Sequence, residues 1–472
     1  MDRITFFIFF TSLLSLQCDH LATKDAKKPN IIILLADDMG YGDFEKIGGA
    51  TETPNLNRLA DEGVFFSNFY AAGPNCSPSR AGLMTGKSPA KVGMFSYRPP
   101  NHPLHLPDEE VTLAELLKNE GYQTAHIGKW HLGELAQNSK LNHPQPYEQG
   151  FDYSLGTENN AQPSHLNPNN FVRNGKTLGV VKGYSCQIVA KECMDWLNQK
   201  NNDPFFLFVA FHEPHAKVAS PPEMVGKYAD QSQKDAEYLA NIDHLDMAIG
   251  RILDYLEEND LMDNTLIIFS SDNGSYRLAS NAGLRAVKSY LYDGGIRVPG
   301  IVKWPKIKTN KKVIHSPTGL VDVVPTLCDI IGIDPPNGLD GTSLLPLLEG
   351  RPFQRQQPLY WFFYRTQPEI AMRIGDHMIL GFDRNDTLPR PHQFSQDDYS
   401  YIKNIRLQDY ELYDLSQDFS EKNNIFKTHP KKDSLKILLD HQLKEIRDNR
   451  YPWRNLPLNL EKRRIKTDWV KY

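Results

Sequence analysis

The sequence predicts an α/β protein with a large, mostly parallel sheet sandwiched by helices and a smaller C-terminal α+β region that contains an antiparallel sheet. Continuous apolar runs alternate with amphipathic helical stretches, which is typical of parallel strands buried on both faces. Several of these runs end abruptly in charged or polar residues, as parallel strands do where a site forms beyond their carboxyl ends. After about residue 345 the pattern changes to short strands separated by turns.

Length and composition limit the number of structural regions and the kinds of partner that can be expected. The chain has 472 residues, 40% of them hydrophobic and 24% charged, with a net charge of −5. A chain of this length is too long to fold around a single hydrophobic core of ordinary size, so two structural regions are expected. The weakly acidic balance gives no support to a nucleic-acid surface. We therefore expect no nucleic-acid partner and only local anion sites.

The first 25 residues are predicted to be a signal peptide and linker. Arg3 precedes an apolar run of about 13 residues, which is too short to span a bilayer and has the size of a signal-peptide core. Cys18 closes this run where a lipoprotein cysteine would lie, although Ser15 and Gln17 make a poor lipidation signal. We expect export to the periplasm or cell surface of a Gram-negative bacterium, with or without a lipid on Cys18, and no membrane span in the mature protein.

Residues 26–345 are predicted to form the catalytic domain. Buried strands are expected in "NIIILLADD", "TAHIGK", "PFFLFVAF" and "NTLIIFSS". Between them, Thr112 and Glu115 form a capping box that starts a helix ended by Gly121, and a long amphipathic helix is expected at about 233–258. These alternating elements are the basis of the predicted parallel sheet.

Residues 346–472 are predicted to form the smaller α+β region, with a soft boundary in the proline-rich stretch 335–358. Short strands are expected in "PLYWFFYRTQ", "AMRIGDHMILGF" and "YELYDL". Gly375 and Asp376 suit a hairpin turn, and a basic helix is expected at about 431–448.

Four of the predicted strands end directly in chemically active residues: Asp37–Asp38, Lys129–His131, His212 and Asp272–Asn273. Because the carboxyl ends of parallel strands lie at one edge of a sheet, we expect these groups to meet. Carboxylate and amide oxygens suit Ca²⁺ or Mg²⁺ and do not suit zinc. Together with Lys288, the lysines and histidines predict a metal and several cations around an oxyanion.

The segment "NCSPSRAGLMTG" contains the one cysteine, Cys76, with polar and basic neighbours. Its spacing from the other cysteines fits neither a zinc site nor a disulfide scaffold, and Cys186, Cys193 and Cys328 are expected to be small buried hydrophobes. Pro78 favours a first helical turn, so residue 76 is expected beside a helix N-terminus that attracts an anion. A thiolate matches hard oxygen ligands poorly, which suggests that residue 76 does not act as cysteine.

The segment "CSPSRAGLMTG" resembles the signature C-x-P-S-R-x-x-L-x-T-G of the type I sulfatases, a branch of the alkaline phosphatase superfamily. Further landmarks resemble that family in the same order along the chain: "PNIIILLADDMGYGD", "GYQTAHIGKWHLG", "FHEP", "SSDNG", "LRAVKSYLYDGGIRVP", "LDGTSLLPLL" and "ELYDLSQDFSEKNNI". Two conservative departures occur, Ala286 where glycine is usual and Asp293 where glutamate is usual. The resemblance implies an alkaline-phosphatase-like fold and a sulfuric ester hydrolase.

The resemblance also implies roles for individual residues. The cysteine of the family motif is oxidised by a maturation enzyme to Cα-formylglycine, whose hydrate attacks sulfur. One Ca²⁺ would be held by formylglycine 76 and four further ligands: Asp37, Asp38, Asp272 and Asn273. The implied catalytic residues are Cys76, Arg80, Lys129, His131, His212 and Lys288.

The resemblance implies a separate role for each catalytic side chain. Lys129 and Lys288 neutralise charge on the sulfuryl oxygens, and Arg80 orients residue 76. His131 holds the diol and assists its breakdown. The H-x-P spacing favours His212 as the general acid. "HEPH" offers a second histidine, His215, as a substrate contact or a mere loop residue.

The substrate must be recognised by loops. The polar stretch 156–175, which contains Asn159, His165 and Arg173, is one predicted wall that would bind sugar hydroxyls, and 95–107 is another. A sulfated poly- or oligosaccharide is therefore expected, either from algal polysaccharide or from glycosaminoglycan. Three alternatives stay open: a phosphodiesterase or phosphonate monoester hydrolase of the same superfamily, a non-catalytic sugar-binding relative, and a cysteine hydrolase that uses Cys76.

Overall fold

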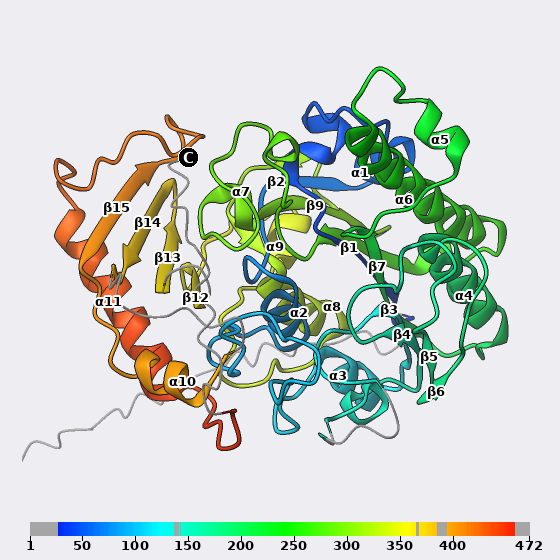
Figure 1. Ribbon diagram of the computed structural model, residues 1–472, viewed down its shortest axis with the longest axis horizontal. Helices are drawn as coiled ribbons and strands as arrows, with labels where there is room; N and C mark the ends of the chain where they lie inside the picture. The colour runs from blue at the N-terminus through cyan, green and yellow to red at the C-terminus, as the bar shows by residue number, and fades with distance from the viewer. Residues whose placement is uncertain (1–26, 136–140, 142, 365–367, 385–393, 458–472) are drawn as a thin grey trace, which may run out of the picture.

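The structure is a computed structural model that describes residues 27–135, 141, 143–364, 368–384 and 394–457 (Figure 1). The predicted signal peptide and Cys18 lie outside this range. Within it, no helix is both long enough and apolar enough to cross a membrane.

The predicted large, mostly parallel sheet is confirmed. It has 11 strands in the order β10-β2-β9-β8-β1-β7-β3-β4-β5-β6, and β11 pairs with β2. The central pairs β8–β1, β1–β7, β7–β3 and β3–β4 are parallel, while β9 is antiparallel to both β2 and β8. The strands are β1 Asn30–Asp37, β2 Val64–Tyr70, β3 Gln123–Lys129, β4 Tyr153–Thr157, β5 Val172–Arg173, β6 Lys176–Thr177, β7 Phe205–Pro214, β8 Thr265–Ser271, β9 Arg297–Lys303, β10 Val313–Ile314 and β11 Thr318–Gly319.

Helices cover both faces of this sheet because the central strands are apolar on both sides. Successive side chains of a strand point to opposite faces, so Ile31 and Ile33 of β1 enter one core while Ile32 and Leu34 enter the other. One face is covered by α1 Pro54–Glu62, α4 Ser185–Gln199 and α6 Gln233–Glu258, and the opposite face by α2 Cys76–Thr85, α3 Leu113–Asn119 and α8 Val323–Ile331. The predicted helix at 233–258 and the Thr112–Glu115 capping box are confirmed.

A second sheet of four antiparallel strands follows, as the sequence predicts. Its order is β12-β13-β14-β15, and α11 Lys432–Asn449 packs on β13 and β14 (Figure 1). The strands are β12 Leu359–Tyr364, β13 Pro368–Ile374, β14 His377–Phe382 and β15 Asp409–Asp414. Gly375 and Asp376 form the predicted hairpin turn. The remaining short helices are α5 Pro222–Gly226, α7 Asp293–Ile296, α9 Leu345–Leu348 and α10 Gln396–Ile402.

One core joins the two sheets. Residues of β12, β13 and β14 belong to the same buried cluster as the α2–α8 face of the large sheet. Trp361 of β12 shows this connection, because its ring packs on Tyr70 with centroids 5.3 Å apart and its Nε1 donates to the Ala71 carbonyl at 2.8 Å. The second sheet thereby holds the chain between β2 and α2, which carries Cys76.

The strand order brings the predicted strand ends together. Asp272 directly follows β8, and Asp37, His212 and Lys129 lie in β1, β7 and β3; these four strands are consecutive neighbours in the sheet. The predicted meeting of these residues at one sheet edge is therefore confirmed. Gly128, just before Lys129, allows β3 and β7 to approach closely.

The variant Gly128→Ala is expected not to fold stably. A Cβ at this position would lie 1.8 Å from the Ala210 carbonyl oxygen, and the backbone φ is +116°. The matched control is Gly121→Ala, where φ is +82° and no atom lies within 4 Å of the added Cβ. Denaturant unfolding should show a loss of about 1 kcal/mol for the control and more than about 4 kcal/mol for Gly128→Ala. Equal small losses would contradict the close strand approach.

Candidate active site

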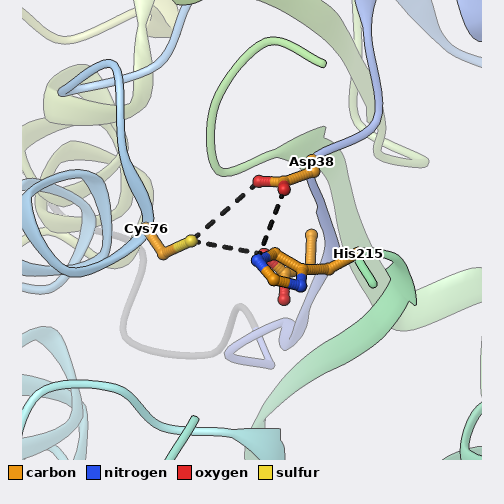
Figure 2. Close-up of side chains that lie close together, drawn as sticks. Asp38, Cys76 and His215 are labelled. Carbon is orange, nitrogen blue, oxygen red and sulfur yellow. Dashed lines mark hydrogen bonds and ion pairs between the residues drawn. The ribbon is translucent and has the colours of Figure 1, made fainter. Parts of the chain in front are cut away.

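Asp37, Asp38, Cys76 and His215 form a cluster whose potential metal-binding atoms all lie within 4.8 Å of one another. Figure 2 shows that Cys76, Asp38 and His215 point toward one another from three separate segments. Asp37 ends β1, Cys76 begins α2, and His215 follows β7. The Cys76 thiol donates to Asp37 Oδ1 at 3.4 Å and lies 4.0 Å from Asp38 Oδ1.

Cys76 lies at the first position of α2, as its motif predicts. The helix begins two residues before Pro78, because the Asn75 side chain caps it and accepts from the Cys76 amide at 3.1 Å. The thiol is 2% exposed, and this burial raises its pKa to about 12 despite Lys129 and Lys288. A cysteine nucleophile needs its thiolate, so this environment disfavours the cysteine-hydrolase alternative.

Arg80 joins two strand ends below Cys76. Its Nε and Nη2 donate to Asp272 Oδ2 at 3.0 and 2.8 Å, and its Nη1 donates to the Lys129 carbonyl at 2.7 Å. Arg80 and Asp272 are both fully buried. Arg80 is one helical turn after Cys76 on the same helix, so this contact fixes the start of α2 against β3 and β8.

Two lysines balance the remaining carboxylates. Lys129 Nζ lies 2.7 Å from Asp37 Oδ2, and both side chains are fully buried. Lys288 Nζ contacts both oxygens of Asp38 at 2.6 and 2.8 Å and lies 3.3 Å from the Cys76 sulfur. The Lys288 side chain is 12% exposed, so it lies on the open side of the cluster.

The oxygen donors fit a hard divalent cation. Asp38 makes two further hydrogen bonds: its amide donates to Asp272 Oδ1 at 3.2 Å, and its Oδ1 accepts from Asn273 Nδ2 at 2.7 Å. Asn273 Oδ1 is buried and has no hydrogen-bond partner among the described residues. A buried, unpartnered carbonyl oxygen beside three carboxylates is the donor set that Ca²⁺ prefers.

The two histidines of "HEPH" are separated by a bulge in β7. Leu35 of β1 pairs with Ala210, but Asp37 pairs with Pro214, so four residues of β7 span the length of two in β1. This shift places His215 beside Asp38, with Nε2 3.5 Å from Asp38 Oδ2 and 21% of the side chain exposed. Burial lowers the pKa of His215, and the Asp38 carboxylate opposes that shift.

His212 lies behind this position. Its Nε2 is 2.8 Å from Thr157 Oγ1, it is 0% exposed, and within the described range no hydrogen bond or ion pair joins it to Cys76 or Asp38. Burial holds its pKa well below the usual range. The structure therefore brings His215, and not the sequence-favoured His212, to the open side of the cluster.

His131 is held in position by a hydrogen bond to the backbone of a neighbouring segment. Its Nε2 donates to the Arg98 carbonyl at 2.9 Å, while its buried Nδ1 has no hydrogen-bond partner in the described part of the chain. The Arg98 amide in turn donates to Ser77 Oγ at 3.0 Å, next to Cys76. The predicted wall 95–107 thus borders the cluster through its backbone.

Of the loop residues predicted to contact substrate, the structure places some near the site and others away from it. Asn159 lies two residues beyond Thr157, which contacts His212, so it stays near the site. His165 is fully buried, with Nδ1 3.5 Å from Glu213 Oε1 on the turn that carries His215. Its backbone also donates to the Lys217 carbonyl at 3.1 Å. His165 thus braces that turn from within and has no surface to offer a substrate.

Arg173 is not brought to the site. It donates to Glu192 of α4 at 2.9 and 2.7 Å and lines a cavity that also contains Gln123, the first residue of β3. Gln123 and Lys129 are the first and last residues of β3 and lie about 20 Å apart at the usual rise per residue. In the sheet register Arg173 pairs with Leu155, which in turn pairs with Ile127, two residues before Lys129. The Arg173 side chain nevertheless turns to Glu192, which the polarity of the loop alone did not reveal.

Sequence reasoning missed two residues near the cluster. Asn160 accepts from Lys129 Nζ through its Oδ1 at 3.4 Å. Tyr276, 37% exposed, follows Ser275, whose carbonyl accepts from the Lys288 amide at 2.9 Å, so Tyr276 lies next to Lys288. The sequence feature that could have identified Tyr276 is its position four residues after Asp272, at the end of a predicted strand.

Ca²⁺ is expected to stabilise the protein, because it would neutralise the carboxylates at this edge. At a concentration one hundred times its Kd, it should add about 2.7 kcal/mol to the free energy of unfolding. Thermal unfolding should show this gain in the wild type and its loss in Asp272→Asn. The matched control Asp195→Asn, in the cavity of Arg173, should keep the gain. An equal gain in all three proteins would contradict the metal site.

Comparison with known proteins agrees with this geometry. Residues 29–333 match the Sulfatase family, and residues 286–449 match the family described as N-sulphoglucosamine sulphohydrolase, C-terminal. Human N-acetylgalactosamine-6-sulfatase is 34% identical over 390 residues, which are 75% of this chain and 72% of that protein.

Two solved structures have the same architecture. Ps i-CgsB in complex with k-i-k-neocarrahexaose is 27% identical, with a TM-score of 0.77 over 91% of this chain and 95% of that chain. BT4656 in complex with D-glucosamine-2-N,6-O-disulfate is 24% identical, with a TM-score of 0.72 over 90% of this chain and 99% of that chain, and supports the fold alone. The signature around Cys76, the charged cluster that it enters and these matches agree: the chain belongs to the sulfatase family and is a sulfuric ester hydrolase.

Proposed function

We propose that this enzyme hydrolyses sulfate esters on a carbohydrate, through formylglycine formed from Cys76 and with one Ca²⁺. The observation that carries the proposal is the position of Cys76 at the start of α2, in contact with Asp37 and Lys288. The names of the relatives support a sugar substrate, since one is an N-acetylgalactosamine-6-sulfatase and another is in complex with k-i-k-neocarrahexaose. The proposed substrate is a fragment of sulfated algal polysaccharide or glycosaminoglycan.

Formylglycine at position 76 would supply a hydrated aldehyde as an oxygen nucleophile, and Ca²⁺ would supply positive charge beside the sulfuryl oxygens. An oxygen in place of the thiol also suits the hard-oxygen neighbours better than sulfur does. The five ligands would be residue 76, Asp37, Asp38, Asp272 and Asn273, of which Asn273 Oδ1 has no other partner in the described structure.

The chain's own side chains would hold the substrate and move its protons. Lys129 and Lys288 would bind the sulfuryl oxygens from two sides, where their charges stabilise the developing negative charge. Arg80 would fix residue 76 through the start of α2. His131, anchored by Nε2 on the Arg98 carbonyl, presents Nδ1 as a proton acceptor.

We assign the general-acid role to His215 in place of His212. The leaving sugar oxygen must arrive from the open side of the cluster, where the His215 side chain is 21% exposed. His212 is fully enclosed and held by Thr157, so it would support the bulge and not reach the substrate.

The enzyme is also proposed to be exported and to require a maturation enzyme for Cys76. The apolar run at the N-terminus supports export to the periplasm or cell surface. The alternatives named from the sequence were a phosphodiesterase or phosphonate monoester hydrolase and a non-catalytic sugar binder, and the next experiment tests the proposal against both.

The variant Cys76→Ala is expected to lose sulfate release completely without loss of folded protein, because the change removes only one sulfur atom. The matched control is Cys328→Ala, which removes an equally buried sulfur from α8 and should stay active. Wild type produced with a maturation enzyme should show the mass loss of thiol-to-aldehyde conversion at residue 76 and release sulfate from sulfated oligosaccharides. Faster turnover of phosphate esters, or binding of sugar without turnover, would contradict the proposal.

His215→Ala is expected to reduce turnover of sugar sulfates by about 10²- to 10⁴-fold, because a sugar alkoxide needs a proton to leave. Turnover of 4-nitrophenyl sulfate, whose leaving group needs no proton, should fall much less. His212→Ala should lower both activities by similar factors, since its role is structural. The opposite pattern in the two variants would restore His212 as the acid.

A further inference from the structure

A cavity of about 690 Å³ lies apart from the Cys76 cluster, where the second sheet meets α11. Three segments form it: the chain just before β11, the chain that leads into β12, and the β13–β14 turn, with α11 as the fourth side. The lining residues are Ser316, Pro317, Phe353, Gln354, Arg355, Gln356, Gln357, Pro358, Arg373, Ile374, Gly375, Leu438, His441 and Gln442.

The lining contains hydrogen-bond donors and cations but no carboxylate. It presents two arginines, one histidine, one serine and four glutamines, and none of the 14 described lining residues is Asp or Glu. A second cavity of about 650 Å³ on this protein is lined by Asp152, Glu192 and Asp195, so an acid-free lining is particular to the first of the two. The chemistry of the first lining favours an anion that also carries hydroxyl groups.

Arg373 provides incompletely balanced positive charge. It is 3% exposed, and its Nε and Nη1 have no hydrogen-bond partner in the described structure. Its ion pair is with Asp376 at 3.8 Å, and that carboxylate is 67% exposed. A buried guanidinium is costly unless it is fully paired, so an anion in the adjoining cavity would lower its energy.

Arg355 is held in place by the fold. Its Nη1 and Nη2 donate to Asp322 at 2.7 and 2.9 Å, and Asp322 is fully buried. On the opposite side, Leu438 of α11 is 47% exposed and Phe353 is partly buried. Arg355 is thus a rigid part of the wall, and its nitrogens already donate to protein oxygens. Apolar surface beside the glutamine and histidine side chains of the lining suits a sugar ring, which has apolar faces and polar edges.

We propose that this cavity is a second saccharide-binding site for an anionic sugar, separate from the site of sulfate hydrolysis. The choice of an anionic sugar rests on the proposed function, while the preference for an anion rests on Arg373 and the acid-free lining alone. The site would hold a sulfated or carboxylated unit of a polymer whose sulfate ester is cleaved elsewhere on the enzyme.

The test uses the full chain with Cys76→Ala, so that no ligand is consumed. Isothermal titration with a chondroitin 6-sulfate tetrasaccharide is compared with the same protein carrying Gln442→Glu, which adds a carboxylate to the lining on the surface of α11. Binding at the cavity should weaken by at least about tenfold. The matched control is Gln199→Glu in the second cavity, which should change nothing.

Two further measurements keep the cavity distinct from the catalytic cluster. Binding at the cluster should be lost in Lys288→Ala, and binding at the cavity should survive that change. In matured enzyme, Gln442→Glu should leave the turnover of 4-nitrophenyl sulfate unchanged. Tetrasaccharide binding that Gln442→Glu does not alter would overturn the proposal. Equal affinity of the cavity for inorganic sulfate would overturn the saccharide assignment.

Discussion

The balance of buried charge at the carboxyl edge of the central sheet governs the rest of this structure. Asp37, Asp38 and Asp272 are at most 1% exposed. Arg80, Lys129 and Lys288 lie within 3.0 Å of them. Removing one member of such a buried pair costs about 3–5 kcal/mol, because the other charge is left uncompensated. The strands, helix α2 and the loop that carries Lys288 must therefore meet at fixed positions.

Without a ligand, the buried charges and unpartnered polar atoms of this edge cost folding free energy. With a bound metal and substrate, the same groups become ligands and hydrogen-bond partners. The lysines that offset the carboxylates are also the groups that would bind a sulfuryl oxyanion, so a metal and a substrate would each take over part of the existing ion pairing. Asn273 Oδ1 and His131 Nδ1 are buried without partners in the described structure. Their cost is that of unsatisfied polar groups, which in native proteins mark sites that another group completes.

Much of the fold and the site could be predicted from the sequence because both leave local patterns. Apolar runs ending in "DD", "GKWH" and "SDNG" predicted the strands and the edge where they meet, and the Thr112–Glu115 capping box predicted the start of α3. Other features depend on distant contacts. The bulge between Leu35 and Asp37 decides whether His212 or His215 faces Asp38, and no spacing within "HEPH" encodes it.

The sequence by itself determined which residue types converge: carboxylates, lysines and a cysteine placed at strand ends and a helix start by short-range periodicity. The tertiary structure decided which of the polar loop residues reach them. It turned Arg173 toward Glu192 of α4, enclosed His165 against Glu213, and left Arg373 buried beside an acid-free cavity. These outcomes depend on contacts between segments far apart in the chain, and the energy of such contacts is not contained in local sequence.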